Sequence, residues 1–268
     1  MSLRLLHLSD IHFGGENREA VEAATAFALA TPYDLMVVSG DLTQYGAPAE
    51  FASAAVWLEG IPGPKLVMPG NHDTPWFGLM ERLADPFGGF RRAIGPARES
   101  AFDSPALAVR AFNSARGWQI RLNWSKGEVS RGQADRAALG LESAPLGAVR
   151  IAACHHPLLE AHGGAMTAKV RGGRRAARIL ARAGADIILT GHVHVPFVEP
   201  LPFGDERTYA VGAGTLSLRE RGVLPGFNLI EIAGEQLTVT ALGWTGRALQ
   251  VEKTWGETLR PRAGANQA

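Results

Sequence analysis

Five short polar segments of the chain contain the residue types that bind metal ions. They are Asp10-Ile11-His12, Gly40-Asp41, Gly70-Asn71-His72-Asp73, His155-His156-Pro157 and Gly191-His192-Val193-His194. Six of the eight histidines lie within them, which is not how solvated or core histidines are distributed along a chain. Imidazole, carboxylate and amide groups together favour iron, manganese, zinc or cobalt over metals selected by thiolates. The pattern predicts a metal centre built from distant segments.

The spacing within the segments indicates two ions rather than one. Asp10 and His12 are two positions apart on an extended backbone, so their side chains lie on the same side and can bind one ion. Asp41 can bridge two ions, because a carboxylate has two oxygens and its charge lets two cations lie close together. The histidines of 192–194 can serve one ion each where a loop bends between them, and Asn71 offers a neutral oxygen ligand.

The first half of the chain alternates apolar strands with helices. Continuous apolar runs predict strands at Leu3–Leu8, Leu35–Val38 and Lys65–Met68. Alanine-rich stretches with helical composition, Asn17–Ala30 and Pro48–Leu58, separate them. This βαβαβ order is typical of a sheet covered by helices.

The second half repeats the alternation and then becomes all β. We expect a strand at Val149–Ala153, a helix at Gly173–Ala183, and further strands at Asp186–Leu189, Thr208–Val211, Phe227–Ile232 and Gln236–Leu242. The region Pro86–Arg121, rich in Gly, Pro and Arg, has no clear pattern. Four of the five polar segments directly follow a predicted strand, and the one at 70–73 follows after Pro69. Strand ends open onto the functional crevice of α/β sheets, so the segments are expected to converge there.

Composition excludes several classes of protein. A length of 268 residues, 46% hydrophobic and 20% charged residues are ordinary for a soluble globular protein. A net charge of +1 does not favour a nucleic-acid binder. The single cysteine, Cys154, excludes an intramolecular disulfide framework. No apolar run reaches the length of a membrane span, and Arg4 and His7 interrupt any signal-peptide h-region. We therefore expect a cytoplasmic protein with one domain, residues 1–250, and a tail, residues 251–268. A homo-oligomer is compatible with this composition.

The order and spacing of the five segments resemble the calcineurin-like metallophosphoesterase superfamily over residues 3–245. The short forms DIH, GDLT, GNHD, HHP and GHVH are most similar to bacterial cyclic-nucleotide and glycerophosphodiester phosphodiesterases. The resemblance implies an α/β fold, a four-layer α/β/β/α sandwich with two mixed sheets flanked by helices. It implies one metal ion held by Asp10, His12, Asp41 and His194, and a second held by Asp41, Asn71, His155 and His192. One departure is Leu158, where such phosphodiesterases usually have a second proline, and it affects the loop on the substrate side.

The implied activity is hydrolysis of a phosphoester by a hydroxide between two metal ions, with iron, manganese or zinc expected. Two cations about 3.5–4 Å apart lower the pKa of a bridging water and clamp the phosphoryl oxygens, so no covalent intermediate is needed. His72 is expected to stabilise charge or protonate the leaving oxygen, with Asp73 a candidate for orienting it. His156 is a candidate for binding a phosphate oxygen or for supporting His155. His7 is expected to be packed in the protein, and His162 to be solvated.

Four functions, three of them enzymatic, fit the pattern to different degrees. The leading one is a phosphodiesterase acting on a small soluble diester. A pyrophosphatase that cleaves a nucleotide-linked lipid precursor would need an apolar cleft, which the aromatic residues Trp76, Phe77, Phe87 and Phe90 could line, although a core role explains them as well. A nuclease could use the basic residues Lys169, Arg171, Arg174, Arg175, Arg178 and Arg182, which a solvated helix face explains equally well. An inactive binding scaffold would be expected to lack ligands, and none is missing.

Overall fold

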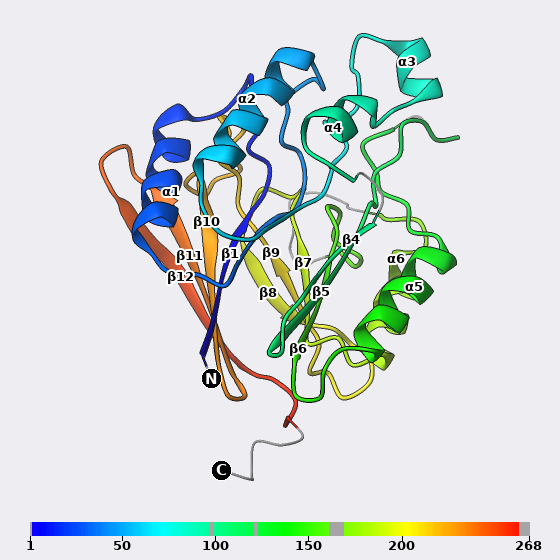
Figure 1. Cartoon of the computed structure of the whole chain (residues 1–268), viewed down its shortest axis with the longest axis vertical. Helices are drawn as coiled ribbons and strands as arrows, with labels where there is room; N and C mark the ends of the chain where they lie inside the picture. Colours follow the sequence, from blue (N-terminus) through cyan, green and yellow to red (C-terminus); the bar gives the residue numbers. More distant parts are fainter. Residues whose placement is uncertain (1, 97–98, 121–122, 161–168, 263–268) are drawn as a thin grey trace.

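The computed structural model describes residues 2–96, 99–120, 123–160 and 169–262. These residues form two six-stranded mixed sheets packed face to face (Figure 1). The first sheet has the order β12 (Leu249–Thr258), β11 (Gln236–Trp244), β10 (Gly226–Ala233), β1 (Ser2–Leu8), β2 (Leu35–Val38) and β3 (Lys65–Val67). The second has the order β4 (Glu99–Asp103), β5 (Leu107–Phe112), β6 (Val149–Ala153), β7 (Ile187–Thr190), β9 (Tyr209–Gly212) and β8 (Phe197–Pro200).

Helices cover the outer face of each sheet. In Figure 1, α1 (Arg18–Ala30) and α2 (Pro48–Gly60) lie against the first sheet, and α5 (Arg131–Glu142) and α6 (Gly173–Arg182) against the second. Two short helices, α3 (Leu79–Ala84) and α4 (Gly88–Ala93), lie at the upper end of that view. The predicted four-layer α/β/β/α sandwich is confirmed.

Three layers of apolar side chains hold these four layers together. One lies between the sheets and contains residues of both, such as Leu5, Val37, Val109 and Ile187. A second lies between the first sheet and α1 and α2, and a third lies between the second sheet and α5 and α6. Strands such as 35–38 and 187–190 are buried at every position, because each has a neighbouring layer on both faces.

Local sequence signals explain where the helices begin. The side chain of Asn17 accepts a hydrogen bond from the backbone N–H of Ala20 and caps α1. Ser130 and Gln133 form a capping box that starts α5, a helix the sequence analysis did not identify. The unassigned region Pro86–Arg121 contains α4, β4 and β5.

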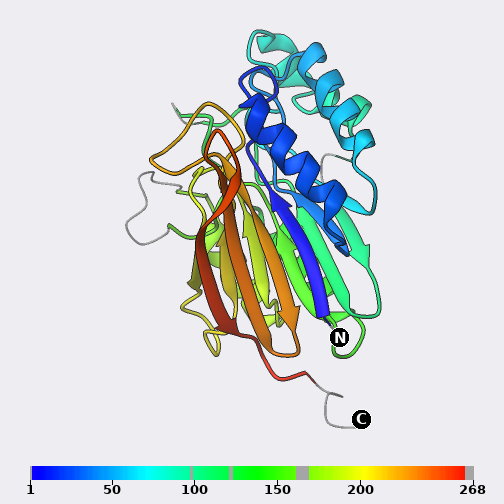
Figure 2. The ribbon, with the colours of Figure 1, turned by 90° about the vertical axis from the view of Figure 1, so that its left-hand side faces the viewer.

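The end of the first sheet extends further along the chain than expected. The predicted domain boundary at residue 250 falls inside β12, which pairs antiparallel with β11 up to Thr258. Figure 2 shows β12 (red) at the edge of this sheet. His7 is fully buried in β1, as expected, whereas His162 lies outside the described residues. Within the described part of the chain, no helix is long and apolar enough to cross a membrane.

Candidate metal centre

The loops after β1, β2, β3, β6 and β7 meet at one end of the two sheets. Backbone hydrogen bonds join them directly: the N–H of Asp10 donates to Gly40 O (2.9 Å), and that of His12 to Asp41 O (3.0 Å). The N–H of Gly191 donates to His155 O (2.9 Å). These bonds join loops about 30–36 positions apart in two pairs, and the N–H of His192 links the pairs by donating to Oδ2 of Asp10 (2.8 Å).

Most predicted ligands have left-handed backbone conformations. Six described residues other than glycine have a positive φ, and five of them are predicted ligands, at φ between 52° and 69°: Asp10, His12, Asp41, His192 and His194. Such a conformation costs an L-residue about 1–2 kcal/mol. Strained backbone of this kind persists where the surrounding structure imposes it, and it clusters at functional sites.

The side chains of Asp10, His12 and His194 form one compact group. Nε2 of His194 lies 3.1 Å from Oδ1 of Asp10 and 3.4 Å from Nε2 of His12. Nε2 of His12 lies 3.7 Å from the same Asp10 oxygen. All three side chains are buried. The arrangement can hold one ion between two imidazoles and a carboxylate.

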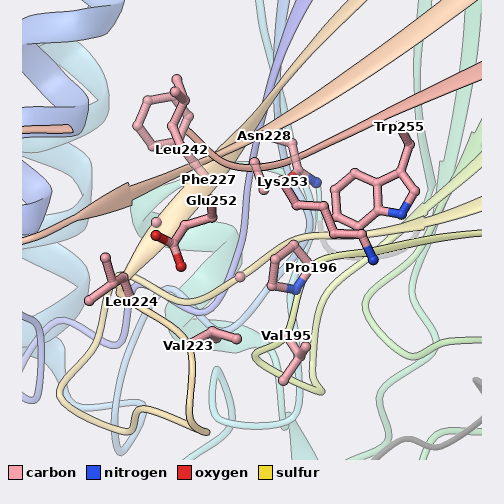
Figure 3. Close-up of a pocket in the computed structure, with 13 residues that line it drawn as sticks. Val195, Pro196, Val223, Leu224, Phe227, Asn228, Leu242, Glu252, Lys253 and Trp255 are labelled. Carbon is pink, nitrogen blue, oxygen red and sulfur yellow. The ribbon is translucent and has the colours of Figure 1, made fainter. Parts of the chain in front are cut away.

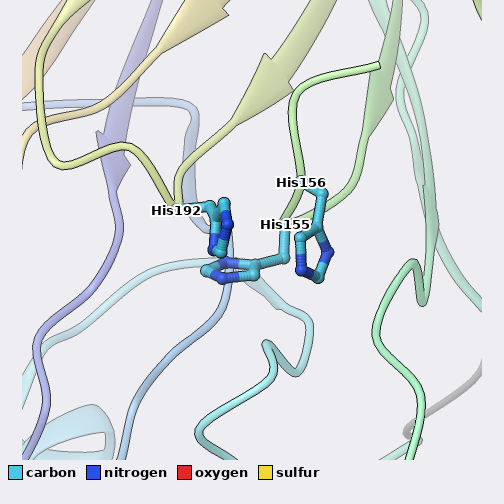
Figure 4. Close-up of side chains that lie close together, drawn as sticks. All are labelled: His155, His156 and His192. Carbon is cyan, nitrogen blue, oxygen red and sulfur yellow. The ribbon is translucent and has the colours of Figure 1, made fainter. Parts of the chain in front are cut away.

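Asp41 connects this group to a second one. Its Oδ2 lies 3.9 Å from Nε2 of His12 and 3.2 Å from Nε2 of His155. The ring of His155 in turn meets that of His192 edge to face, with centroids 5.2 Å apart (Figure 4). Asn71 is nine-tenths buried, and its neighbour His72 donates its backbone N–H to Oδ1 of Asp41 (2.7 Å). The carboxylate of Asp41 therefore lies between the two groups, as a bridging ligand must.

The hydrogen-bonding pattern of the imidazoles fits metal ions. Nδ1 of His155 lies 2.8 Å from Ser39 O, and Nδ1 of His194 lies 2.9 Å from Arg219 O. A carbonyl oxygen only accepts, so the ring hydrogen of each neutral imidazole is on Nδ1 and a lone pair is on Nε2. Each Nε2 points at a carboxylate oxygen, at 3.2 and 3.1 Å. A ring proton, or a metal ion bound by the neutral ring, can lie between the two atoms, so the geometry is compatible with a metal site.

Buried polar atoms without a hydrogen-bond partner gather at the same place. Among the described residues they include Oδ1 of Asp10, Oδ1 of Asn71 and Nε2 of His155. A buried polar atom without a partner costs free energy, so three such atoms in one cluster indicate a binding site for a cation. The residues present thus fit the two metal ions that the sequence pattern implies.

The charges of the cluster are strongly interdependent. Burial would raise the pKa of the Asp10 carboxyl, but His194 and His155 together lower it well below its usual range. Burial would likewise raise the pKa of Asp41, and His155 lowers it. Burial opposes the charged form of His155, yet Asp41 and Asp10 raise its pKa to about 9. Both carboxylates therefore stay ionised and attract cations.

His156 contacts protein atoms through both ring nitrogens. Its Nδ1 lies 2.9 Å from the Ser114 hydroxyl, and its Nε2 lies 2.8 Å from Ser125 O. The side chain is fully buried and packs against His155 and His192 (Figure 4). Of the two roles considered for His156, this geometry favours support of the neighbouring histidines over contact with a phosphate oxygen.

His72 faces a cavity beside the cluster, and Asp73 does not line that cavity. Nδ1 of His72 lies 2.7 Å from Gln44 O, and its ring stacks on Trp76 with an interplanar angle of 13°. Burial is the main cause that lowers the pKa of His72. The carboxylate of Asp73 instead accepts bonds from the backbone N–H groups of residues 42, 43 and 70, and so anchors the loop that carries Asp41.

A cavity of about 580 Å³ opens next to Asn71 and His72. Its other lining residues are Trp76, Leu79, Arg82, Asn123, Trp124, Ser125 and Arg219. Trp124 and Arg219 were not predicted from the sequence, because neither belongs to a recurring motif. Their only common signal is position in loops that tertiary structure brings to the same end of the sheets.

A second cavity, of about 260 Å³, lies beside the segment that directly follows His194 (Figure 3). It is lined by Val195 and Pro196, by Val223 and Leu224, and by residues of β10, β11 and β12 that include Asn228 and Trp255. None of the predicted ligands lines it. Of these two cavities, the one beside Asn71 is therefore the one adjacent to the predicted metal ligands.

Comparisons with known proteins agree with this geometry. The model of the calcineurin-like phosphoesterase family matches residues 3–196, well over half of the chain. This range contains all seven predicted metal ligands and ends just after His194.

Two curated relatives match shorter stretches. A protein described as a probable cyclic nucleotide phosphodiesterase, from Synechococcus sp., is 28% identical over 94 residues, which cover 32% of this chain and 35% of that protein. The glycerophosphodiester phosphodiesterase GpdQ of Enterobacter lignolyticus is 36% identical over 80 residues, which cover 26% of this chain and 29% of that protein. The matched stretches thus span about a third of the length of these relatives.

Solved structures share the fold at low sequence identity. Purple acid phosphatase PPD1 from yellow lupin, Lupinus luteus, superposes with a TM-score of 0.67 at 12% identity, over 97% of this chain and 54% of that one. GAP50, described as the anchor in the inner membrane complex of Plasmodium, gives a TM-score of 0.59 at 13% identity, over 97% of this chain and 89% of that one. At these identities the likeness establishes the fold alone.

Proposed function

Since the chain belongs to the calcineurin-like phosphoesterase family, we propose that it is a dinuclear metal-dependent phosphodiesterase acting on a small soluble diester. The observation that carries the proposal is the orientation of two buried imidazoles. Nε2 of His155 and Nε2 of His194 each point at a carboxylate oxygen, at 3.2 and 3.1 Å. Imidazoles in this orientation, once deprotonated, can share a metal ion with those carboxylates.

Each predicted ligand has a defined task. Asp10, His12 and His194 hold one ion, and Asn71, His155 and His192 hold the other, with Asp41 shared between them. Iron, manganese or zinc suits this set of ligands. When bound, two such ions supply a water of lowered pKa and positive charge for the phosphoryl oxygens. The carbonyls of residues 39 and 219 hold the rings of His155 and His194 in the orientation that ligation needs.

The cavity beside Asn71 accepts the rest of the substrate. Two indole side chains, Trp76 and Trp124, line it together with Leu79. Planar substituents pack well against such rings, so a diester of the cyclic-nucleotide type fits the cavity better than one of the glycerophosphodiester type. His72, in the same wall, faces the position where the ester oxygens would lie.

Neither enzyme alternative has an observation that favours it over the diesterase. Of the four aromatic residues considered for a lipid cleft, Trp76 and Phe77 are exposed, but Phe90 is fully buried and Phe87 packs against the core between α1, α2 and the first sheet. A nuclease would need its basic residues beside the metal centre. The α6 arginines lie on the outer face of the second sheet, where Arg174 and Arg178 stack on Phe203.

The non-enzyme alternative is an inactive scaffold with the same fold. GAP50, described as an anchor, shares that fold. An inactive scaffold has no need to keep buried carboxylates opposite imidazole nitrogens, and this chain has two such pairs. The complete set of ligands therefore supports an enzyme.

The decisive experiment pairs metal analysis with a diester assay. We expect the purified protein to hold about two metal ions per chain and to hydrolyse bis(p-nitrophenyl) phosphate. Chelation should abolish turnover, and manganese or cobalt should restore it. Comparison of a cyclic nucleotide with a glycerophosphodiester then ranks the two substrate types. Turnover that survives exhaustive metal removal would exclude the two-metal mechanism, and metal binding without turnover on any phosphoester would favour the scaffold.

A further inference from the structure

The loop between β9 and β10 places the positively charged side chain of Arg219 at the candidate site. The backbone carbonyl of Arg219, in this loop, accepts a hydrogen bond from Nδ1 of His194 (2.9 Å). Its guanidinium Nη1 lies 3.0 Å from Nε2 of His72. One residue therefore contacts both a predicted metal ligand and the histidine predicted to act on the substrate.

The hydrogen-bond direction at His72 can be assigned from its two partners. Nδ1 faces Gln44 O at 2.7 Å, and because a carbonyl only accepts, the ring hydrogen is on Nδ1. Nε2 then carries a lone pair and accepts a hydrogen bond from Arg219, since a guanidinium only donates. In this arrangement His72 has no proton to offer to the cavity. The donor that faces the cavity is the guanidinium.

The lining of the cavity is suited to an anion. Among the described residues, its lining contains two guanidinium groups, Arg82 and Arg219, and no carboxylate. The guanidinium group of Arg82 is largely occupied by contacts within the protein, because its Nε donates a hydrogen bond to Gly117 O (2.6 Å) and the group stacks over Trp124. Arg219 is exposed, and in the part of the chain that the structure describes it has no ion-pair partner. Its remaining donors are available to a ligand.

We propose that Arg219 is a catalytic residue that binds a non-bridging phosphoryl oxygen of the substrate and stabilises the charge that develops there. A guanidinium is permanently charged and its planar donors match phosphoryl oxygens. His72 is then a positioning residue that holds the guanidinium against the cavity wall next to Asn71. The proposal rests on the proposed function, because it assigns the substrate's phosphoryl group to this side of the metal centre.

The first test compares Arg219→Ala with Arg221→Ala. Arg221 is an exposed arginine in the same loop that does not line the cavity, so its substitution removes the same charge nearby. Replacing Arg219 keeps the carbonyl that holds His194, so both metal ions should stay bound. We expect kcat on a diester to fall by about 10²–10³, the usual effect of losing one donor to a developing oxyanion. Arg221→Ala should stay within about twofold of wild type.

Binding of inorganic phosphate provides a readout independent of turnover. Calorimetry with the metal-loaded protein should show phosphate binding about tenfold more weakly to Arg219→Ala than to wild type, a loss of about 1.4 kcal/mol. Arg219→Lys should recover part of this affinity but little of kcat, because lysine lacks the planar pair of donors. Added guanidinium ion should partly rescue Arg219→Ala, an effect that a merely structural role would not produce.

The role of His72 is tested by a double-mutant cycle. If His72 acts through Arg219, the His72→Ala, Arg219→Ala double variant should be no slower than Arg219→Ala alone. The loss in Arg219→Ala should also be equal for good and poor leaving groups, because a non-bridging oxygen is the one contacted. Additive losses would show that His72 acts independently of Arg219 and would overturn the positioning role. A loss in Arg219→Ala that is confined to poor leaving groups would place the guanidinium on the leaving oxygen and would overturn its assignment to a non-bridging oxygen.

Failure of this proposal can be told apart from failure of the proposed function. If the metal-loaded wild type hydrolyses no diester, the function is wrong, and phosphate calorimetry alone decides whether Arg219 binds anions. If Arg219→Ala matches Arg221→Ala in both kcat and phosphate affinity, Arg219 has no such role. Loss of a metal ion from Arg219→Ala would equally overturn the proposal, because it would make the side chain structural.

Discussion

Gly191→Ala should disable the metal centre through a single added methyl group. A Cβ at this position would lie 1.8 Å from the hydroxyl of Ser9 and 2.5 Å from Oδ2 of Asp10. That same Asp10 oxygen accepts hydrogen bonds from Ser9 Oγ (2.6 Å) and from the N–H of His192 (2.8 Å). The clash therefore falls on the atoms that hold a predicted ligand in place.

The size of the displacement sets the expected effect. Ordinary contact begins near 3.4 Å, so the hydroxyl of Ser9 must move by about 1.6 Å and the Asp10 carboxylate by about 0.9 Å. Metal–ligand distances tolerate only about 0.2 Å. We expect at least one metal ion to be lost or bound much more weakly, and turnover to fall by at least about 10²-fold, the usual cost of a 1 Å misplacement. Overpacking should also destabilise the fold by about 1–3 kcal/mol.

The assay measures metal content, diester turnover and thermal stability on the same preparations. Gly256→Ala is the matched control, because Gly256 lies in the edge strand β12 with open space around its Cβ position and no positive φ. It should change neither metal content nor turnover. If Gly191→Ala binds two ions and turns over within about threefold of Gly256→Ala, the tight packing of the Gly191 loop on Asp10 is not what holds the metal centre together.

Three further outcomes follow from the same structure. Asp41→Asn should lose more activity than substitution of any terminal ligand such as Asn71, because it removes the charge between two cations; equal losses in kinetic assays would argue against bridging. Burial lowers the pKa of His7 to about 3, so its stabilising contribution is complete above the unfolded value of 6.5 and is lost as the pH falls towards 3. Between pH 7 and pH 5, the free energy of unfolding of the wild type should fall by about 2 kcal/mol more than that of His7→Gln, at 1.36 kcal/mol per pKa unit. Urea unfolding measures both changes, and an equal change in the two proteins would refute this. The pKa of His155 is raised to about 9, and metal ligation needs the neutral ring. Metal affinity should therefore increase from pH 6 to pH 9, and binding should release a proton. Calorimetry in two buffers of different ionisation enthalpy detects that proton.

The sequence predicted most of the strands and helices that carry the candidate site. Strands 35–38 and 149–153 have the predicted bounds, and α1 begins and ends within one residue of its prediction, because continuous apolar runs and a capping asparagine are local signals. The capping box at Ser130 and Gln133 was an equally local signal for α5, and it was missed. By contrast, β4 and β12 are edge strands, each paired with a single neighbour, and neither contains a continuous apolar run, so their composition did not reveal them.

The chemical character of the site was determined by the sequence alone. Residue types and order in five short segments are sufficient to predict two metal ions and their seven ligands, since ligand chemistry depends on side-chain identity.

Only the tertiary structure decided how those ligands are oriented and what surrounds them. The left-handed backbone at residues such as Asp10 and His194 is imposed by contacts between loops, and the tautomers of His155 and His194 depend on carbonyls of Ser39 and Arg219, which lie outside the motifs. Trp124 and Arg219 reach the cavity for the same reason. Hydrogen-bond direction and cavity shape depend on distances between segments far apart in the chain, and no local pattern of residues encodes those distances.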